Sequence, residues 1–287
     1  MLSYQHIYHA GNFADVHKHL ALMLLLEHLS ANPGSFSFYD SHAGRGLYDL
    51  ASTEAEKTRE HKAGITAIAG KGDDSSAAAR YLKLINDFRT SHGETSYPGS
   101  PAIAQTFMRR GDRMFLTELH PGEFEHLLEN LGQYGSVEVS KRDGLEFIAR
   151  LTKPHHLRGL VLIDPSYEIK TEYRDVARTV MRAQSNWSSA IYMVWYPILK
   201  DERHKQMVRS LLSLGGNKAF ESRLMAPPAI AGERMQGSGL VIFGAPEGFM
   251  EELDTAVAEV KDLMFGKGEG EHVMTKGQPV EARPLLI

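Results

Sequence analysis

Short apolar runs rich in β-branched and aromatic residues alternate along the chain with stretches of helical spacing. The apolar runs lie at residues 36–40, 114–118, 137–140, 160–164, 190–196, 219–225 and 239–244. Stretches such as "GEFEHLLENLGQY" and "KDERHKQMVRSLLSLGG" separate them. Strands that alternate with helices predict βαβ units, and therefore an α/β fold with a mostly parallel sheet covered by helices on both faces.

Acidic residues and glycines follow the first four predicted strands. The first strand leads into a turn with Gly44 and Gly46, the second ends on Glu118, the third is followed by Asp143, and the fourth ends on Asp164. Each signal alone is weak, because a helix N-cap or a plain tight turn gives the same pattern. Ligands of such sheets bind at the carboxyl ends of the strands. Together the four signals therefore predict one site for a nucleoside with a charged tail.

The roles expected at this site follow from the residue types. A glycine turn lets the backbone approach a ligand closely. A carboxylate after the second strand can bind both hydroxyls of a ribose, and one after the third can accept a hydrogen bond from an adenine amine. These roles belong to Glu118 and Asp143.

The distance from the glycine turn to the second acid is unusually long. Gly46 and Glu118 are 72 positions apart, whereas dinucleotide-binding folds have about 20 residues there. We therefore expect one domain over residues 1–287 that carries an inserted helical subdomain at 48–95, where the sequence is polar, Ala-rich and helical in pattern. A surface excursion without a role remains an alternative, because insertions into loops cost little.

Composition limits the remaining possibilities. The chain has no cysteine, which excludes disulfides, thiolate metal sites and a cysteine nucleophile. The N-terminus lacks the layout of a signal peptide, and "LALMLLLEHL" is shorter than the ~20 apolar residues that span a bilayer. A cytoplasmic protein is expected. The net charge of −4 requires any nucleic-acid partner to be met by a local basic patch.

The fourth predicted strand ends in "LVLIDPSYE", where Asp164, Pro165, Ser166 and Tyr167 follow the apolar run. The Asp164 carboxylate and the Pro165 carbonyl can each accept one N–H of an exocyclic amine on a planar base. Tyr167 offers a ring on which a base removed from its stack can lie. Taken alone, the motif is equally typical of a turn that ends a strand.

These motifs, together with "YHAGNFADVHKH", "DSHAGRG", "YPGSP" and "TELHP", resemble the bacterial 23S ribosomal RNA adenine-N6 methyltransferase J family. This is a family of class I S-adenosylmethionine-dependent methyltransferases, and the resemblance covers essentially the whole chain. It implies a Rossmann-like sheet of seven strands in the order 3-2-1-4-5-7-6, with the last strand antiparallel. Members have also been linked to the use of external DNA as a nutrient.

The resemblance also implies an activity and its partners. S-adenosylmethionine would be the methyl donor and S-adenosylhomocysteine the product. The acceptor would be an adenine of 23S ribosomal RNA, free of protein or in an early assembly intermediate. A monomer with no membrane contact and no obligate protein partner is expected.

Individual site residues follow from the same resemblance. The cofactor contacts are His19, His42, Gly44, Gly46, Ser100, Glu118, Asp143, Gly144 and Asp164. The catalytic residues are Asp164, Pro165 and Tyr167, and the RNA contacts are Tyr4, Lys18 and Tyr167. Ser166 departs from the family pattern, which has proline there and so fixes φ. We expect a modest loss of preorganisation from this change.

Other functions remain open. Methylation of another planar nitrogen, such as guanine N2, cytosine N4 or a glutamine amide, uses the same motif. A metal-dependent nuclease would require clustered acid and histidine ligands for a divalent ion. A non-catalytic nucleic-acid-binding module would have damaged cofactor positions, whereas Gly44, Gly46, Glu118 and Asp143 are intact. Six histidines in the first 42 residues, with Asp15 nearby, suggest a metal site. No H-E-x-x-H spacing is present and methyl transfer from a sulfonium needs no metal, so we predict none.

Overall fold

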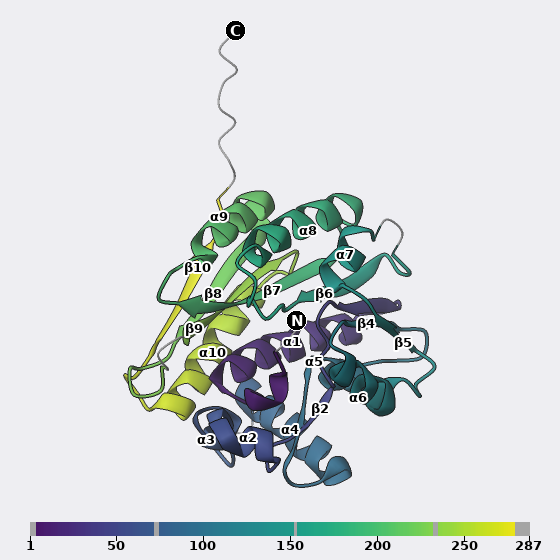
Figure 1. Ribbon diagram of the computed structural model, residues 1–287. Helices are drawn as coiled ribbons and strands as arrows, with labels where there is room; N and C mark the ends of the chain where they lie inside the picture. The colour runs from purple at the N-terminus through teal and green to yellow at the C-terminus, as the bar shows by residue number, and fades with distance from the viewer. Residues whose placement is uncertain (1–3, 72–74, 152–153, 232–234, 279–287) are drawn as a thin grey trace.

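Eight strands form one sheet in the computed structural model, which describes residues 4–71, 75–151, 154–231 and 235–278 (Figure 1). In sheet order they are β10 (Glu271–Lys276), β8 (Ala219–Met225), β9 (Met235–Phe243), β7 (Ile191–Leu199), β6 (Arg158–Ile163), β1 (Phe36–Asp40), β4 (Arg113–Glu118) and β5 (Val137–Lys141).

The sheet has the Rossmann-like arrangement of class I methyltransferases. Strands β5, β4, β1, β6 and β7 are parallel to one another, and β9 lies antiparallel between β7 and β8. The predicted order 3-2-1-4-5-7-6 is therefore confirmed for the seven strands that the sequence indicated. The predicted number of seven is wrong, because β10 pairs antiparallel with β8 at the edge. This strand has exposed ends, partly buried residues between them and no continuous apolar run, which is why the sequence gave little signal for it.

Helices cover both faces of the sheet (Figure 1). One face carries α1 (Phe13–Ala31), α4 (Ala77–His92), α5 (Ser100–Thr106), α6 (Pro121–Leu131) and α10 (Phe249–Phe265). The other carries α7 (Gly144–Ala149), α8 (Glu172–Asn186) and α9 (His204–Gly215). Strand β6 contributes side chains to the hydrophobic cores on both faces of the sheet. Leu160 and Leu162 pack on the first face, while Val161 and Ile163 pack on the second.

Helix α1 is buried along most of its length. The Asn12 side chain caps it by accepting a hydrogen bond from the Asp15 backbone N–H. Every residue from Phe13 to Leu26 is buried, as expected for a helix that is apolar over most of its surface. Its few polar side chains are therefore held inside the protein and need partners there.

Two short strands lie at the two ends of the segment from 48 to 95. β2 (Leu47–Asp49) and β3 (Ser96–Pro98) pair antiparallel. Between them lie α2 (Thr53–Thr58), η2 (Glu60–Ala63), α3 (Ile65–Ile68) and α4. The Ile65 backbone N–H donates to the Gly11 carbonyl at 2.9 Å. The segment therefore lies against the residues that lead from η1 (His6–Tyr8) into α1.

Candidate active site

A cavity of about 730 Å³ lies at the carboxyl ends of β1, β4 and β6. The loop after β5 and the start of α1 also line it. It brings together residues that are far apart in the chain, namely Tyr4, Lys18, His19, His42, Gly44, Ser100, Glu118, Asp143, Gly144, Asp164, Pro165 and Tyr167. Gly46 does not line the cavity. It takes φ +76°, packs against Leu127 and Leu131, and accepts a hydrogen bond from the Gly99 backbone N–H at 2.9 Å.

Glu118 ties together two turns at one end of the cavity. Its two carboxylate oxygens accept hydrogen bonds from the backbone N–H of Gly44 at 2.9 Å and of His120 at 2.7 Å. Burial raises the pKa of Glu118, and these two hydrogen bonds oppose the rise. A carboxylate has about four lone-pair sites, so each oxygen can also accept a hydrogen bond from a ligand hydroxyl.

Asp143 and Gly144 form the start of α7. The Asp143 carboxylate caps the helix by accepting from the Glu146 backbone N–H at 2.8 Å. Asp143 is thus a helix N-cap, which was the alternative interpretation of the pattern, and it also lines the cavity. A Cβ on Gly144 would lie 1.8 Å from the Ser41 carbonyl oxygen. Only glycine therefore lets α7 approach the turn after β1.

We expect Gly144→Ala to lower the free energy of unfolding by about 1–3 kcal/mol, because backbone atoms must move to admit the methyl group. The same movement should weaken cofactor binding. Thermal unfolding and calorimetric titration with S-adenosylhomocysteine would measure both. Gly135→Ala is the control, since a Cβ there meets nothing within 4 Å. An unchanged Tm for Gly144→Ala would contradict this prediction.

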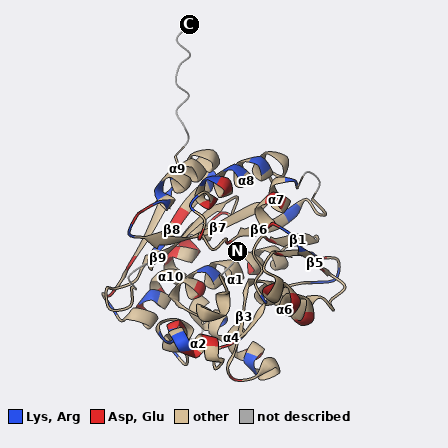
Figure 2. Ribbon diagram, in the orientation of Figure 1, with Lys and Arg blue, Asp and Glu red and all other residues tan. Residues whose placement is uncertain are grey.

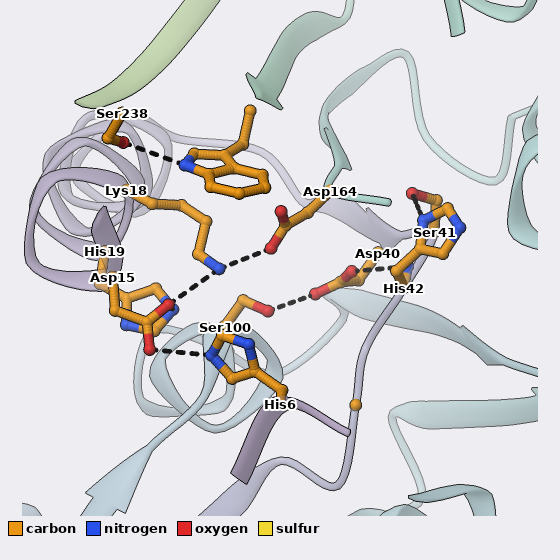
Figure 3. A network of polar contacts seen from close by, with 12 residues as sticks. His6, Asp15, Lys18, His19, Asp40, Ser41, His42, Ser100, Asp164 and Ser238 are labelled. Atoms are coloured by element: carbon orange, nitrogen blue, oxygen red, sulfur yellow. Dashed lines mark hydrogen bonds and ion pairs between the residues drawn. The ribbon is translucent and has the colours of Figure 1, made fainter. Parts of the chain in front are cut away.

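Lys18 links two carboxylates at the other end of the cavity (Figure 3). Its Nζ lies 2.5 Å from Asp164 Oδ2 and 3.0 Å from Asp15 Oδ1. The Lys18 and Asp15 side chains are 5% and 2% exposed, so this is a buried charge cluster. Burial alone would lower the pKa of Lys18, but the two carboxylates outweigh it and raise the pKa. Lys18 is therefore a cation, and it directs one carboxylate oxygen of Asp164.

The two aspartates differ in how their charge is stabilised. Burial tends to raise the pKa of Asp15, but His6, Lys18 and His19 together hold it well below its usual value. Burial raises the pKa of Asp164, and Lys18 only partly offsets this. Asp164 is thus the member of the cluster with the higher affinity for a proton.

Asp40, the acid that begins the DSHAGRG motif after the first predicted strand, is a third buried carboxyl at this edge, for which the sequence indicated no specific role. Its carboxylate accepts hydrogen bonds from the Ser100 hydroxyl at 2.7 Å and from the His42 backbone N–H at 3.1 Å (Figure 3). Burial raises the pKa of Asp40 to about 7, although both hydrogen bonds lower it. Ser100, predicted as a cofactor contact, is therefore bonded to Asp40 and lies at the cavity wall.

The raised pKa of Asp40 predicts a pH-dependent stability. The folded protein keeps a proton on Asp40 that the unfolded chain releases above pH 3.8. The free energy of unfolding therefore falls as pH rises toward 7, by about 1.4 kcal/mol per pH unit. Asp40→Asn mimics the neutral acid, since its amide can donate to Ser100. We expect it to flatten the dependence of unfolding free energy on pH between 4 and 7, measured in urea. The exposed Asp49→Asn should leave the slope unchanged. A slope that survives Asp40→Asn would show that another group is responsible.

Tyr167 has an unusual backbone conformation for a residue with a large side chain. Its φ is +55°, a left-handed value that costs energy and often marks a functional site. The ring stacks on Tyr173 with centroids 4.4 Å apart, and the hydroxyl donates to the Trp195 carbonyl at 2.7 Å. The ring is thus fixed in the second core, and Tyr167 also lines the cavity.

The predicted histidines have partners within the protein. His19 Nδ1 bonds with the Tyr97 hydroxyl at 2.7 Å, and His42 Nδ1 bonds with the Ser41 hydroxyl at 2.7 Å. Burial lowers the pKa of His19 to about 3 and that of His42 to about 4, so both are neutral. In the described part of the chain, no three His, Asp or Glu side chains are grouped to hold a metal ion.

Several lining residues lay outside the sequence-based assignment. His6 bonds with Asp15 at 2.8 Å and with the Tyr4 hydroxyl at 2.8 Å, and Trp195 closes the cavity beside Lys18. Asp15, Lys18 and His19 are spaced i, i+3, i+4, which is a signal for one helix face that the sequence did contain. Across the described ranges, no helix is long and apolar enough to cross a bilayer.

Comparisons with known proteins agree with this geometry. A family model described as "Ribosomal RNA large subunit methyltransferase D, RlmJ" (RsmJ) matches residues 33–274. The ribosomal RNA large subunit methyltransferase J of Haemophilus influenzae is 37% identical over 271 residues, which cover 94% of this chain and 96% of that protein. The Escherichia coli protein of the same name is 33% identical over 270 residues, with the same coverage.

A solved structure is similar over nearly the whole chain. The crystal structure of a Legionella pneumophila protein superposes with a TM-score of 0.83 at 33% identity, and covers 94% of this chain and 98% of that one. The resemblance that the sequence motifs indicated is therefore confirmed, and this chain belongs to the RlmJ family of ribosomal RNA large subunit methyltransferases.

Proposed function

We propose that this protein transfers the methyl group of S-adenosylmethionine to the N6 amine of an adenine in 23S ribosomal RNA. The observation that carries the proposal is a buried carboxylate at the end of a central strand. Asp164 is followed by the Pro165 carbonyl, and both line the same cavity as the glycine turn and Glu118. Acceptors of this kind suit an exocyclic amine, in a chain whose relatives are named as ribosomal RNA methyltransferases.

The residues of the cavity fit the methyl donor. Glu118 has acceptor capacity for the ribose hydroxyls beyond its two backbone hydrogen bonds. Asp143 would accept from the adenine amine of the cofactor, and Gly44 and Gly144 would present backbone without a side chain to it. Neutral His19 and His42, with Ser100, would border its remaining surface. When bound, the donor supplies a methyl group on a positively charged sulfur.

Asp164 and Pro165 would hold the acceptor amine. The lone pair of that nitrogen is delocalised into the base, so the free amine is a poor nucleophile. Two acceptors that each take one N–H draw the nitrogen toward tetrahedral geometry and direct its lone pair at the methyl carbon. A carbon–nitrogen bond forms, the carbon–sulfur bond breaks, and S-adenosylhomocysteine remains. Positioning and electrostatic complementarity of this kind lower a barrier by several kcal/mol.

The reaction also has to release a proton. The methylated nitrogen carries a positive charge and becomes strongly acidic. Burial raises the pKa of Asp164, so its carboxylate is suited to take this proton or to pass it to water. Lys18 keeps the carboxylate in position through one of its oxygens and leaves the other for the amine.

The substrate base would lie between the end of β6 and Trp195. Tyr167 and Trp195 line this part of the cavity, and stacking of a base on an aromatic ring contributes about 1–3 kcal/mol. Tyr4 also lines the cavity, and its ring stacks on His9 with centroids 5.5 Å apart. We expect the RNA to contact Tyr4 and Lys18 as it delivers the base.

The RNA backbone requires positive charge on a chain of net charge −4. Lys and Arg lie along α8 and α9 (Figure 2). Their exposed members include Arg174, Arg178, Lys205 and Arg209. Helix α8 begins soon after the Asp164–Tyr167 motif, so we expect Arg174 and Arg178 to attract RNA toward this side of the protein. We further propose that residues 48–95 form a helical subdomain beside the site and that the protein acts in the cytoplasm.

Methyl transfer to protein-free 23S ribosomal RNA and to assembled large subunits would test this proposal. The RNA would come from cells that lack the modification, and nucleosides would be resolved by mass spectrometry. We expect N6-methyladenosine with free RNA and much less with assembled subunits, unaffected by EDTA. Methylguanosine or methylcytidine would instead support another planar nitrogen as acceptor. Metal-dependent cleavage without methylation would support the nuclease.

A further inference from the structure

A chain of side-chain hydrogen bonds runs from the base end of the cavity across one face of the sheet to the surface of α10. We call it the histidine chain, and its members in order are Trp195, Ser238, His17, Ser222, His272 and Asp254. Trp195 Nε1 lies 3.0 Å from Ser238 Oγ, which lies 2.9 Å from His17 Nδ1. His17 Nε2 lies 2.9 Å from Ser222 Oγ, which lies 3.0 Å from His272 Nε2. His272 Nδ1 lies 3.2 Å from Asp254 Oδ1.

The interior of the histidine chain is shielded from water. His17, Ser222 and Ser238 are 0% exposed, the His272 side chain is 3% exposed, and the Asp254 side chain is 58% exposed. Burial lowers the pKa of His17 to about 3. It also lowers the pKa of His272, although Asp254 opposes this. Both imidazoles are therefore neutral, and each has one donor and one acceptor nitrogen.

The two ends of the histidine chain determine where every proton lies. The Asp254 carboxylate only accepts, so His272 must carry its proton on Nδ1 and accept from the Ser222 hydroxyl at Nε2. Ser222 then accepts from His17 Nε2–H. His17 Nδ1 accepts from the Ser238 hydroxyl, and Ser238 accepts from the Trp195 indole, which can only donate. Every donor meets one acceptor.

The opposite direction is disfavoured at both ends. It would leave the unprotonated His272 Nδ1 facing the Asp254 carboxylate. It would also make Ser238 accept twice and deprive its own hydroxyl of His17 as an acceptor. A buried hydroxyl without an acceptor costs free energy. The histidine chain therefore has one favoured proton arrangement, which gives it a fixed geometry.

We infer that the histidine chain is a positioning device for the methyl-transfer site, with His17 as its central residue. It holds the indole edge of Trp195, whose ring lies 5.6 Å from Lys18 Nζ and 6.2 Å from the Tyr167 ring. His17 and Lys18 are neighbours on α1. The same turn of the helix therefore contacts β8 and β9 through His17 and Asp164 through Lys18. The functional part of this inference rests on the proposed base-methylating activity.

The proton arrangement can be tested without any methylation assay. The chain contains two tryptophans, Trp187 and Trp195, so an ¹H–¹⁵N spectrum has two indole signals, and Trp187→Phe assigns them. Imidazole ¹⁵N shifts should show His17 protonated on Nε2 and His272 on Nδ1. Asp254→Ala removes the terminal acceptor and should shift the Trp195 signal. Glu251→Ala, at another exposed acid of α10, should not.

The opposite tautomer at His17 would overturn the inference. A Trp195 signal that does not respond to Asp254→Ala would do the same. Because these measurements use the protein alone, they remain decisive even if the RNA substrate is wrong.

The positioning role is tested by two substitutions of His17. His17→Leu removes both hydrogen bonds, whereas His17→Asn keeps an oxygen near the position of Nδ1 to accept from Ser238. We expect His17→Leu to lower kcat for RNA methylation about tenfold with cofactor affinity unchanged within about twofold, and His17→Asn to recover most of the rate. Equal rates for the two variants would contradict the role, as would a parallel loss of cofactor affinity. If His17→Leu fails to fold, Asp254→Ala and its spectra decide the question.

Discussion

Asp164→Ala should reduce methyl transfer about 10³-fold, a loss far larger than any accompanying loss of cofactor affinity. The substitution removes the carboxylate that would accept an N–H of the target amine, and loss of one such preorganised partner typically costs 10²–10³ in kcat. It also removes the group with raised pKa that is suited to take the released proton. Asp164→Asn should also lose most of the rate, because the Lys18 ammonium would hold the amide oxygen and leave the NH₂ donor facing the target amine. Single-turnover assays with 23S ribosomal RNA measure the chemical step.

The control for this prediction is Asp201→Ala, whose side chain is 44% exposed. It removes an aspartate of the same charge and should leave the rate within about twofold. Calorimetric titration with S-adenosylhomocysteine separates catalysis from cofactor binding. An Asp164→Ala protein that binds the cofactor and retains a tenth or more of the rate would contradict the catalytic role.

Lys18→Met should destabilise the protein by about 3–5 kcal/mol near pH 8, because it leaves the buried carboxylates of Asp15 and Asp164 without their shared cation. The loss should shrink as pH falls. In the variant the folded-state pKa values of Asp15 and Asp164 would both be higher than in the wild type, so the unfavourable charges are relieved as pH falls and grow as pH rises. In the wild type the raised pKa of Lys18 keeps its contribution constant through neutral pH.

Urea unfolding at pH 5 and pH 8 would measure this difference. The control is Lys83→Met, at an exposed pair in which the Lys83 and Asp87 side chains are 75% and 65% exposed. Exposed pairs contribute little, so the control should change stability only slightly at either pH. If Lys18→Met loses the same free energy of unfolding relative to wild type at both pH values, the cluster does not carry the charges assigned to it.

The sheet was predictable because its central strands are buried on both faces. Such strands appear in the sequence as continuous apolar runs, and the runs ending at Glu118 and Asp164 marked where the ligand edge would lie. β10 was missed because a half-exposed edge strand needs no such run. The order of the seven remaining strands came from the family resemblance, since periodicity contains no information about which strands are neighbours.

The sequence indicated which residues form the site, but it contained little information about the contacts between them. Acids at strand ends are visible in sequence, but the Lys18–Asp164 ion pair joins residues 146 positions apart. Tyr167 has a left-handed conformation and a ring that contacts β7 and α8, and no local sequence pattern reveals either. Asp40 shows the same limit, because its raised pKa depends on its burial in the folded protein.

The most direct test of the account uses S-adenosylmethionine with a deuterated methyl group. Protein-free 23S ribosomal RNA that lacks the modification would be incubated with the protein, digested and analysed by mass spectrometry. The account predicts that the deuterated methyl group appears on the exocyclic nitrogen of adenosine, and that Asp164→Ala abolishes it. Label on guanosine, cytidine or a ribose would contradict the assignment of the Asp164–Tyr167 end of the cavity, as would no label from a protein that binds the cofactor.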